Sequence, residues 1–258
     1  MKSRKQNYTT LPPENVYPTL DDSFFEKLAV SSGRIKKSPD DSFFPKNYLD
    51  TEKLKDKERL SKLLNEFKAL LDTNLINERG IVKFIKDKQA DFLVASLLKK
   101  YYGRFGHHDA YLFPEFKLAD DLAVDYLLVG LGSGGWEFVF IEFEAPKKNI
   151  TLKNGHFGDS YRKGIKQIND WKNWLQANYS TLKLTYNKKM KEGVILPREF
   201  TELDISRLHF VVVAGRRGDF KDTTYNLRRQ TSEKDNILYL HYDNIVDAAQ
   251  NIIGQWTY

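Results

Sequence analysis

The most apolar segment of the chain ends in two acidic residues. Residues 138–144 read FVFIEFE, and a continuous run of aromatic and β-branched side chains predicts a buried strand. Side chains alternate between the two faces of a strand, so Glu142 and Glu144 share the face that carries Phe138 and Phe140. Two like charges at the end of a buried strand repel each other. A cation beside them would relieve that repulsion, so this strand end is the first candidate for a functional site.

The rest of the hydrophobic pattern predicts an α/β fold. Helical periodicity runs from Thr51 to Leu71 and again from Glu78 to Leu98, and a long loop is expected over residues 145–158. Strands are predicted at 110–116, 122–129, 136–144, 208–214 and 237–241, and further helices at 160–178, 222–231 and 243–253, the last one capped by Asp243. This order of elements predicts a mixed sheet flanked by helices.

The first part of the chain differs in character from the rest. We expect residues 1–75 to form a mostly helical or irregular N-terminal extension and residues 76–258 to form the main domain. The pentapeptide DDSFF occurs twice in the extension, at residues 21–25 and 40–44. Its paired aromatic residues could anchor an arm of the chain, or the repetition could be a coincidence. We expect the extension to serve in assembly or in sensing.

A glycine-rich stretch between two predicted strands determines their pairing register, and with it which acidic residues lie next to each other. It reads GLGSGG from Gly130 to Gly135, lacks the Lys-Ser/Thr of a phosphate-binding loop and is followed by a strand, so a hairpin turn is predicted. If these two glycines lie opposite each other, Asp125 faces Phe140 across the hairpin. Asp125 is then diagonal to Glu142 on the same face. A register shifted by one residue would turn Asp125 to the opposite face.

Three carboxylates, from Asp125, Glu142 and Glu144, would then converge at one end of the sheet. A hard divalent cation such as Mg²⁺, or Mn²⁺ in its place, accepts one or two carboxylates and completes its coordination with water and substrate phosphate. Such an ion can activate a water molecule and stabilise charge on a phosphate under attack. The alternative is that the two glutamates merely line a solvated strand end.

Basic residues follow directly after the acidic strand. Residues 145–191 contain eleven basic and two acidic residues, a local charge of +9 in a chain whose net charge is +6. This block suits a polyanion held near a metal site, although a solvated lysine-rich helix and loop would look the same. Phosphate contacts of this kind would be independent of base sequence. The candidate nucleic-acid-binding residues are Lys147, Lys148, Lys153, Arg162, Lys163 and Lys166.

Composition excludes several other classes of site. The chain has no cysteine, so it has no thiol nucleophile, zinc-cysteine site or disulfide. It has no signal-peptide pattern near its start and no apolar run of the roughly 20 residues that span a bilayer. We therefore expect a cytoplasmic protein that does not enter a membrane. A glycoside hydrolase with two carboxylates is disfavoured, because the acids adjoin a basic block and lack a nearby aromatic platform for sugars.

The acidic hairpin resembles the PD-(D/E)XK nuclease superfamily, in which an aspartate, a short turn, a Glu-x-(Lys or Glu) strand and a helix follow one another. A closer resemblance is to the Shedu family of bacterial anti-phage nucleases. It is carried by IEFEAPKKNITLKNGHFGDSYRKGIKQINDWKNWL, with its Glu-x-Glu-x-Pro strand and its Gln-Ile-x-x-Trp helix, and by the later VVVAGRRG and ILYLHYDNI segments. The resemblance covers roughly Glu78 to Ile253.

The resemblance implies a restriction-endonuclease-like fold and a metal-dependent DNA endonuclease that acts as a homo-oligomer in anti-phage defence. It implies that Asp125 and Glu142 are metal ligands, while Glu144 stands where many relatives carry a lysine. Glu144 could itself bind metal or act as a base. The helix glutamine of similar nucleases matches Gln167, and a helix acid that points toward the same cluster matches Glu78.

The missing strand lysine leaves two questions open. The positive charge that it would provide could come from Lys166 or from Lys147. The alternative function is a catalytically weak or inactive nuclease fold that binds nucleic acid or acts as a scaffold.

Overall fold

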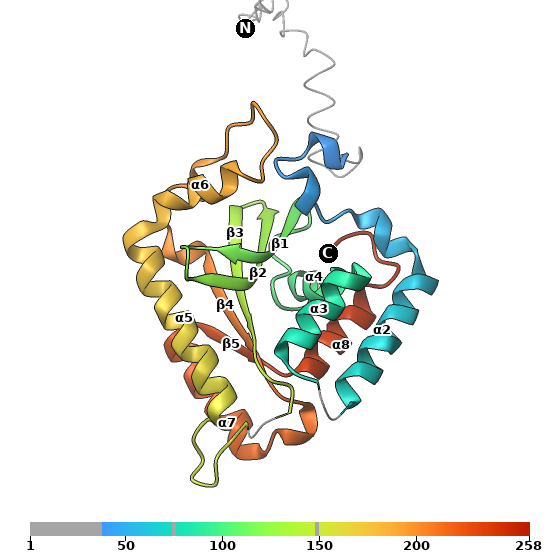
Figure 1. Ribbon diagram of the computed structural model, residues 1–258, viewed down its shortest axis with the longest axis vertical. Coiled ribbons are helices and arrows are strands. Elements are labelled where there is room, and N and C mark those ends of the chain that lie inside the picture. The colour runs from blue at the N-terminus through green and yellow to red at the C-terminus, as the bar shows by residue number, and fades with distance from the viewer. Residues whose placement is uncertain (1–37, 74–75, 148–149) are drawn as a thin grey trace, which may run out of the picture. The chain divides into compact units, whose positions relative to one another are not determined.

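The described residues form one five-stranded mixed sheet. The computed structural model describes residues 38–73, 76–147 and 150–258 (Figure 1). The strands are β1 (Asp109–Lys117), β2 (Ala123–Gly132), β3 (Gly135–Phe143), β4 (Leu208–Val213) and β5 (Ile237–Leu240), adjacent in that order. The first three are antiparallel, whereas β4 and β5 run parallel to β3 and to each other. The predicted α/β fold with a mixed sheet is confirmed.

Helices cover both faces of this sheet (Figure 1). They are α2 (Lys57–Asp72), α3 (Glu78–Lys88), α4 (Phe92–Tyr101), α5 (Asp159–Asn178), α6 (Leu182–Asn187), α7 (Asp222–Asp235) and α8 (Tyr242–Ile252). Short 3-10 helices lie at 39–41, 45–47, 51–55, 179–181, 198–200, 205–207 and 217–219. None of the described helices has the length and apolar character needed to cross a membrane.

The alternation of side chains along β3 divides the core into two layers. Ile141 and Phe143 belong to the core that the sheet shares with α2, α3, α4 and α8. Phe138 and Phe140 belong to the second core, on the face covered by α5 and α6. Glu142 has the same strand parity as Phe140, so it lies on the α5 face, at the end of the sheet.

The single helix expected from Glu78 to Leu98 is wrong, because the chain turns between α3 and α4. Gln89 adopts a left-handed backbone conformation with φ 51°, and its N–H bonds back to the carbonyls of Ile85 and Lys86. This is a common way to end a helix. The break separates the amphipathic α3 from α4, whose residues from Phe92 to Leu98 are all buried. The two helices can then take different directions in the core.

The predicted hairpin register is wrong by two residues. The strands extend to Gly132 and Gly135, which pair with each other across a two-residue turn. Glycine occurs before the turn because another segment packs there. A Cβ at Gly132 would lie 2.4 Å from the carbonyl oxygen of Arg104, and a Cβ at Gly130 would lie 2.8 Å from the ring of Phe105. A shift by two residues preserves the faces along the regular part of the hairpin. The alternation breaks beside Asp125, because Val124 packs in the same core as Leu127.

The described part of the N-terminal region packs into the main body. Of the two DDSFF copies, the first lies outside the described residues. In the second, Phe44 is fully buried, with its ring centroid 5.1 Å from that of Tyr111 and 5.0 Å from that of Phe113. Helix α2 packs into the same core as α4 and α8. The predicted division between residues 75 and 76 stays a prediction.

The cap expected for the last helix is wrong. His241 precedes α8, and its N–H donates to the side chain of Asn244. Asp243 instead accepts hydrogen bonds from the guanidinium of Arg216 and the backbone N–H of Arg217. Arg216 also donates to the carbonyl of Leu71 at the end of α2. The Gly-Arg-Arg turn after β4 therefore ties α8 to α2.

Candidate active site

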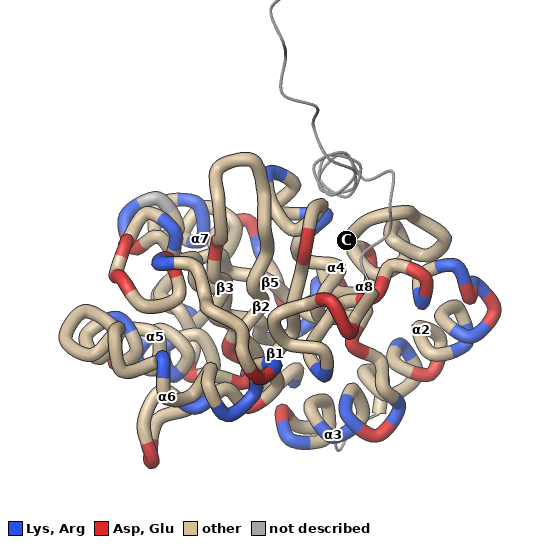
Figure 2. Tube along the Cα trace, turned by 90° about the horizontal axis from the view of Figure 1, so that it is seen from above, with Lys and Arg blue, Asp and Glu red and all other residues tan. Residues whose placement is uncertain are grey.

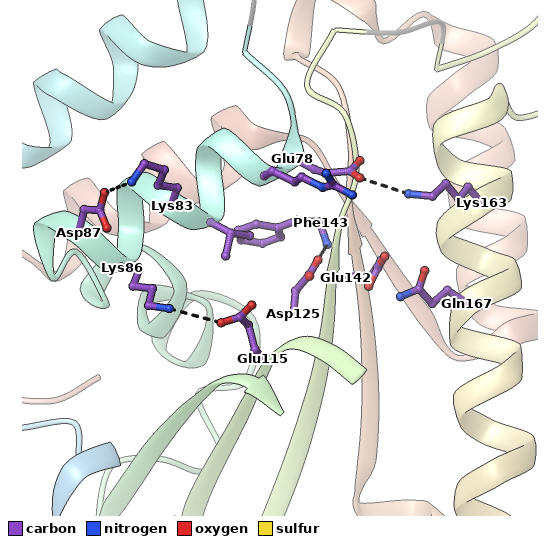
Figure 3. Close-up of a pocket in the computed structure, with 12 residues that line it drawn as sticks. Glu78, Lys83, Lys86, Asp87, Glu115, Asp125, Glu142, Phe143, Lys163 and Gln167 are labelled. Atoms are coloured by element: carbon purple, nitrogen blue, oxygen red, sulfur yellow. Dashed lines mark hydrogen bonds and ion pairs between the residues drawn. The ribbon is translucent and has the colours of Figure 1, made fainter. Parts of the chain in front are cut away.

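A cavity of about 550 Å³ opens where β2 begins and β3 ends (Figure 3). Three neighbouring strands and two helices supply its polar lining. The strand residues are Glu115 from β1, Asp125 from β2 and Glu142 from β3; the helix residues are Glu78, Arg79, Lys83, Lys86 and Asp87 from α3 and Lys163 and Gln167 from α5. The cavity thus brings together acids and bases that are far apart in sequence.

Asp125 lies at the start of β2 and bonds to the neighbouring strand. The last regular pair of the two strands is Tyr126 with Ile141, so the same register places Asp125 opposite Glu142. The Oδ2 atom of Asp125 accepts a 2.8 Å hydrogen bond from the N–H of Phe143. Burial raises the pKa of Asp125 to about 6, with Glu78 adding to the rise and the Phe143 N–H and Lys163 opposing it.

Glu142 is the least compensated acid of the cavity. It is 3% exposed, and its Oε2 atom has no hydrogen-bond partner among the described residues. Burial raises its pKa from 4.5 to about 10, and the negative charges of Asp125 and Glu144 add to the rise. The field at this position therefore favours either a proton or a cation beside the carboxylate.

Glu144 follows directly after β3 and is held by its backbone. Its N–H donates to the carbonyl of Val213 at 2.8 Å, and its carbonyl accepts from the hydroxyl of Tyr242 at 2.7 Å. The side chain is buried. Its Oε2 atom accepts a 3.1 Å hydrogen bond from Lys163, whereas Oε1 has no partner among the described residues. Burial raises the pKa of Glu144, and Lys163 opposes that rise.

Lys163 joins the strand end to helix α3. Besides its bond to Glu144, its Nζ atom lies 3.5 Å from Oε1 of Glu78, the first residue of α3 (Figure 3). Burial alone would lower the pKa of Lys163, but the hydrogen bond to Glu144 and the charges of Glu144, Glu78 and Glu142 raise it overall. Lys163 therefore links Glu78, the helix acid predicted from the resemblance, to Glu144 at the end of β3. Gln167, one turn further along α5, lines the same cavity.

The other predicted nucleic-acid-binding residues do not gather around the cavity. Lys147 donates to the carbonyl of Asp72, and Arg162 forms an ion pair with Asp159. Lys153 and Lys166 are exposed and do not line the cavity. Lys148 lies outside the described residues. Lysines and arginines occur along α2, α3 and α5 alike (Figure 2).

Five polar lining residues were missed by the sequence reasoning: Arg79, Lys83, Lys86 and Asp87 from α3, and Glu115 from β1. Arg79, Lys83 and Lys86 recur every three to four residues, so they share one side of α3. This periodicity is visible in the sequence, but the pattern does not say that α3 borders the cavity. Glu115 has an unusual backbone conformation with φ 46° and lies on the strand next to Asp125. Nothing in its sequence context indicated a site.

The donor chemistry of the cavity fits a hard divalent cation. In the described parts of the chain, no three His, Cys, Asp or Glu side chains are arranged to hold a metal ion as they stand. The prediction that Asp125, Glu142 and Glu144 share one ion therefore stays a prediction. Two carboxylates are nevertheless enough protein ligands for Mg²⁺, which keeps water and takes substrate phosphate. Continuing the strand register places Asp125 opposite Glu142, and among the described residues the buried Oε2 atom of Glu142 has no hydrogen-bond partner.

Comparison with known proteins agrees with the resemblance seen in the sequence. The family model described as "Shedu protein SduA, C-terminal" matches residues 54–246, well over half of the 258 residues. The match begins ahead of α2, so it includes a helix that the resemblance had left outside. No match was found among curated proteins. The matched region contains every described lining residue of the cavity, and the chain belongs to the Shedu family.

Proposed function

We propose that this protein is a metal-dependent DNA endonuclease that hydrolyses phosphodiester bonds in invading DNA. Membership of the Shedu family suggests a role in anti-phage defence. The observation that carries the nuclease proposal is a pair of acids on adjacent strands, the half-buried Asp125 and the buried Glu142, at the wall of an open cavity. In a PD-(D/E)XK nuclease such a pair would hold the catalytic ion. A mixed sheet flanked by helices is compatible with that superfamily.

Asp125 and Glu142 would hold Mg²⁺ or Mn²⁺. Bound there, the ion would supply an activated water and charge stabilisation for the phosphate. The protein's own residues prepare the site in three ways. The Phe143 N–H orients the carboxylate of Asp125. Burial leaves Glu142 with an uncompensated oxygen. Gln167 from α5 lies beside Glu142 in the cavity (Figure 3), where its amide can orient a water or a phosphate oxygen.

We further propose that DNA is bound without strong sequence preference, and that the protein works in the cytoplasm as a homo-oligomer. The cations that line the cavity are side chains suited to phosphate contacts rather than a base-reading element. Such binding would weaken steeply with salt.

The test is cleavage of supercoiled plasmid and of single-stranded DNA by the full chain, with Mg²⁺, Mn²⁺ or a chelator. We expect wild type to cleave only with a divalent ion. Asp125→Ala and Glu142→Ala should each lower the rate by about 1,000-fold or more, because each removes a ligand of the ion. Their DNA affinity should change little. Glu137→Gln, on the same strand but bonded to His209, is the matched control and should cleave normally.

A second candidate function has one observation in its favour. Glu144 occupies the strand position where many similar nucleases carry a lysine, so the chain could be a nuclease fold that binds nucleic acid without cutting it. DNA binding by the wild type without cleavage under any of these ions would favour this reading. Cleavage that survives both Asp125→Ala and Glu142→Ala would contradict the site itself.

A further inference from the structure

Lys163 differs from the other lysines of α5 because it contacts two acidic residues at the end of the sheet. Its Nζ atom lies 3.1 Å from Oε2 of Glu144 and 3.5 Å from Oε1 of Glu78. The Glu144 side chain is only 3% exposed. An ion pair with a buried acid differs from a surface pair, because removal of one partner leaves the other charge buried and uncompensated.

The packing of α5 places Lys163 at this position. Its neighbour Gly164 is buried, and a Cβ there would lie 2.7 Å from a methyl group of Val212 and 3.4 Å from Cγ of Glu144. Only a glycine lets the helix come this close to the ends of β3 and β4. Because the helix backbone is so near Glu144, the adjacent lysine reaches the carboxylate.

The wider cluster is strongly acidic. Glu78, Asp125, Glu142 and Glu144 all act on one another electrostatically, and Lys163 is the cation that acts on each of the three buried or partly buried strand-end acids. The strand position that would carry a positive charge in many relatives is Glu144 itself. In the described structure, the ammonium group that contacts this position comes from the helix.

We propose that Lys163 belongs to the carboxylate site and is not a backbone contact for nucleic acid: from α5 it supplies the positive charge that position 144 lacks. This assignment rests on the proposed function and replaces the nucleic-acid-binding role expected for Lys163 from the sequence. Lys163 is a positioning residue, since it acts through Glu144 and Glu78. The neighbouring Lys166 is exposed and does not line the cavity, so it is the natural comparison.

The test compares Lys163→Met with Lys166→Met in the full-length chain. Three quantities are measured: the affinity of the free protein for Mn²⁺, the affinity for a duplex oligonucleotide in chelator, and plasmid cleavage. Removing a positive charge beside the acids should make Lys163→Met bind Mn²⁺ about tenfold more tightly. Its DNA affinity should stay within about twofold of wild type, while cleavage falls about 100-fold. Lys166→Met should leave Mn²⁺ affinity unchanged.

A conservative variant separates charge from packing. Lys163→Arg keeps the charge, so its Mn²⁺ affinity should return to within about twofold of wild type. Unchanged Mn²⁺ affinity in Lys163→Met would overturn the proposal, whatever happens to DNA affinity. So would an increase that Lys163→Arg reproduces, because the lost charge would then not be its cause.

The outcome for Lys163 can be told apart from the outcome for the nuclease. If wild type binds Mn²⁺ without cleaving DNA, the proposed function fails, and the Mn²⁺ affinities of the variants still decide the role of Lys163. If wild type cleaves DNA and Lys163→Met leaves Mn²⁺ affinity unchanged, the function stands and the role of Lys163 fails. Absence of Mn²⁺ binding in wild type and variant would overturn both.

Discussion

Helices α3 and α5 border the same cavity, but their cations have different partners. On α5, Lys163 contacts Glu144, which is 3% exposed. On α3, Lys83 pairs with Asp87 at 2.6 Å and Lys86 with Glu115 at 3.6 Å, and all four side chains are more than half exposed. Pairs between exposed charges contribute only about 0–1 kcal/mol to stability. The α3 lysines can therefore exchange their partners for a phosphate at little cost, whereas Lys163 cannot.

This difference shows that residue type alone does not define a nucleic-acid contact. Lysine beside a buried acid is part of the acid's environment, and lysine beside an exposed acid is available to a ligand. On this reasoning we propose that nucleic acid approaches along α3, whose Arg79, Lys83 and Lys86 line the cavity. The predictions below test this contrast.

The largest effect is expected on DNA binding when the α3 cations are removed. The triple variant Arg79→Ala, Lys83→Ala, Lys86→Ala should bind duplex DNA about 100-fold more weakly at about 0.1 M salt. The slope of log affinity against log salt should fall by about 2 to 3, because each lost phosphate contact contributes nearly one. Fluorescence anisotropy at several salt concentrations measures both quantities.

The control for this variant removes equal charge elsewhere. Lys57, Arg59 and Lys62 are exposed on α2 and do not line the cavity. Replacing these three with alanine should change the salt slope by less than about one. Equal losses in the two triple variants would show that the cavity side of α3 has no special role.

A second prediction concerns the close approach of α5. Gly164→Ala should lower the free energy of unfolding by about 2 kcal/mol, because its Cβ would overlap Val212 in a packed core. It should also lower cleavage, since the helix must move outward and carry Lys163 away from Glu144. Chemical denaturation and plasmid cleavage measure the two effects. Unchanged stability would mean that the helix shifts freely, and the argument from Gly164 would fail.

A third prediction concerns pH. The raised pKa of Glu142, about 10 against 4.5 for a free side chain, means that the folded protein binds more protons than the unfolded chain between these values. The free energy of unfolding therefore falls as pH rises through this window. In metal-free protein, Glu142→Gln removes this loss and should raise stability by on the order of 2 kcal/mol near pH ~8, and by less near pH ~5.

Thermal unfolding in chelator, at several pH values, checks this effect as a shift of about 5 °C. Glu137→Gln on the same strand should give no gain that grows with pH. A gain for Glu142→Gln that is the same at every pH would mean that the carboxylate is not held in an unfavourable field.

The smallest effect is expected for the surface acid beside the α3 lysines. Glu115→Gln releases Lys86 from an exposed pair, so stability should change by less than about 0.5 kcal/mol. DNA affinity should rise by no more than about threefold, because one acid has left a surface that faces phosphate. A large loss of stability would contradict the view that the α3 pairs are weak.

Much of the fold was predictable from local pattern. The apolar run ending in Glu142 and Glu144 is β3 and the residue after it, and the helix predicted at 160–178 is α5, with Ile168 and Trp171 on its buried side. Predictions failed where a distant segment decided the structure. Gly130 and Gly132 look like turn residues in the sequence. In the structure they lie within β2, and their lack of a side chain lets residues 104–106 pack against the strand.

In the candidate site too, local pattern predicted some features and contacts with distant segments decided others. Alternation along the strands predicted Asp125, Glu142 and Glu144 on one face, and the observed register places Asp125 opposite Glu142 rather than diagonal to it. It was not enough to identify the partner of Glu144. The sequence does not distinguish Lys163 from Lys166 or Lys147 as the partner of Glu144. Lys163 contacts Glu144 because α5 packs closely against the strand ends at Gly164.

By itself, the sequence determined the elements and the faces of their side chains, because both follow from periodicity within a few residues. Tertiary structure alone decided which helices border the acids and which cation contacts them. Electrostatic roles depend on distance and burial, and both are set by contacts between residues far apart in the chain. For this reason the sequence could nominate Asp125 and Glu142 as candidate ligands, whereas the roles that we propose for Lys163 and for the basic side of α3 depend on the tertiary structure.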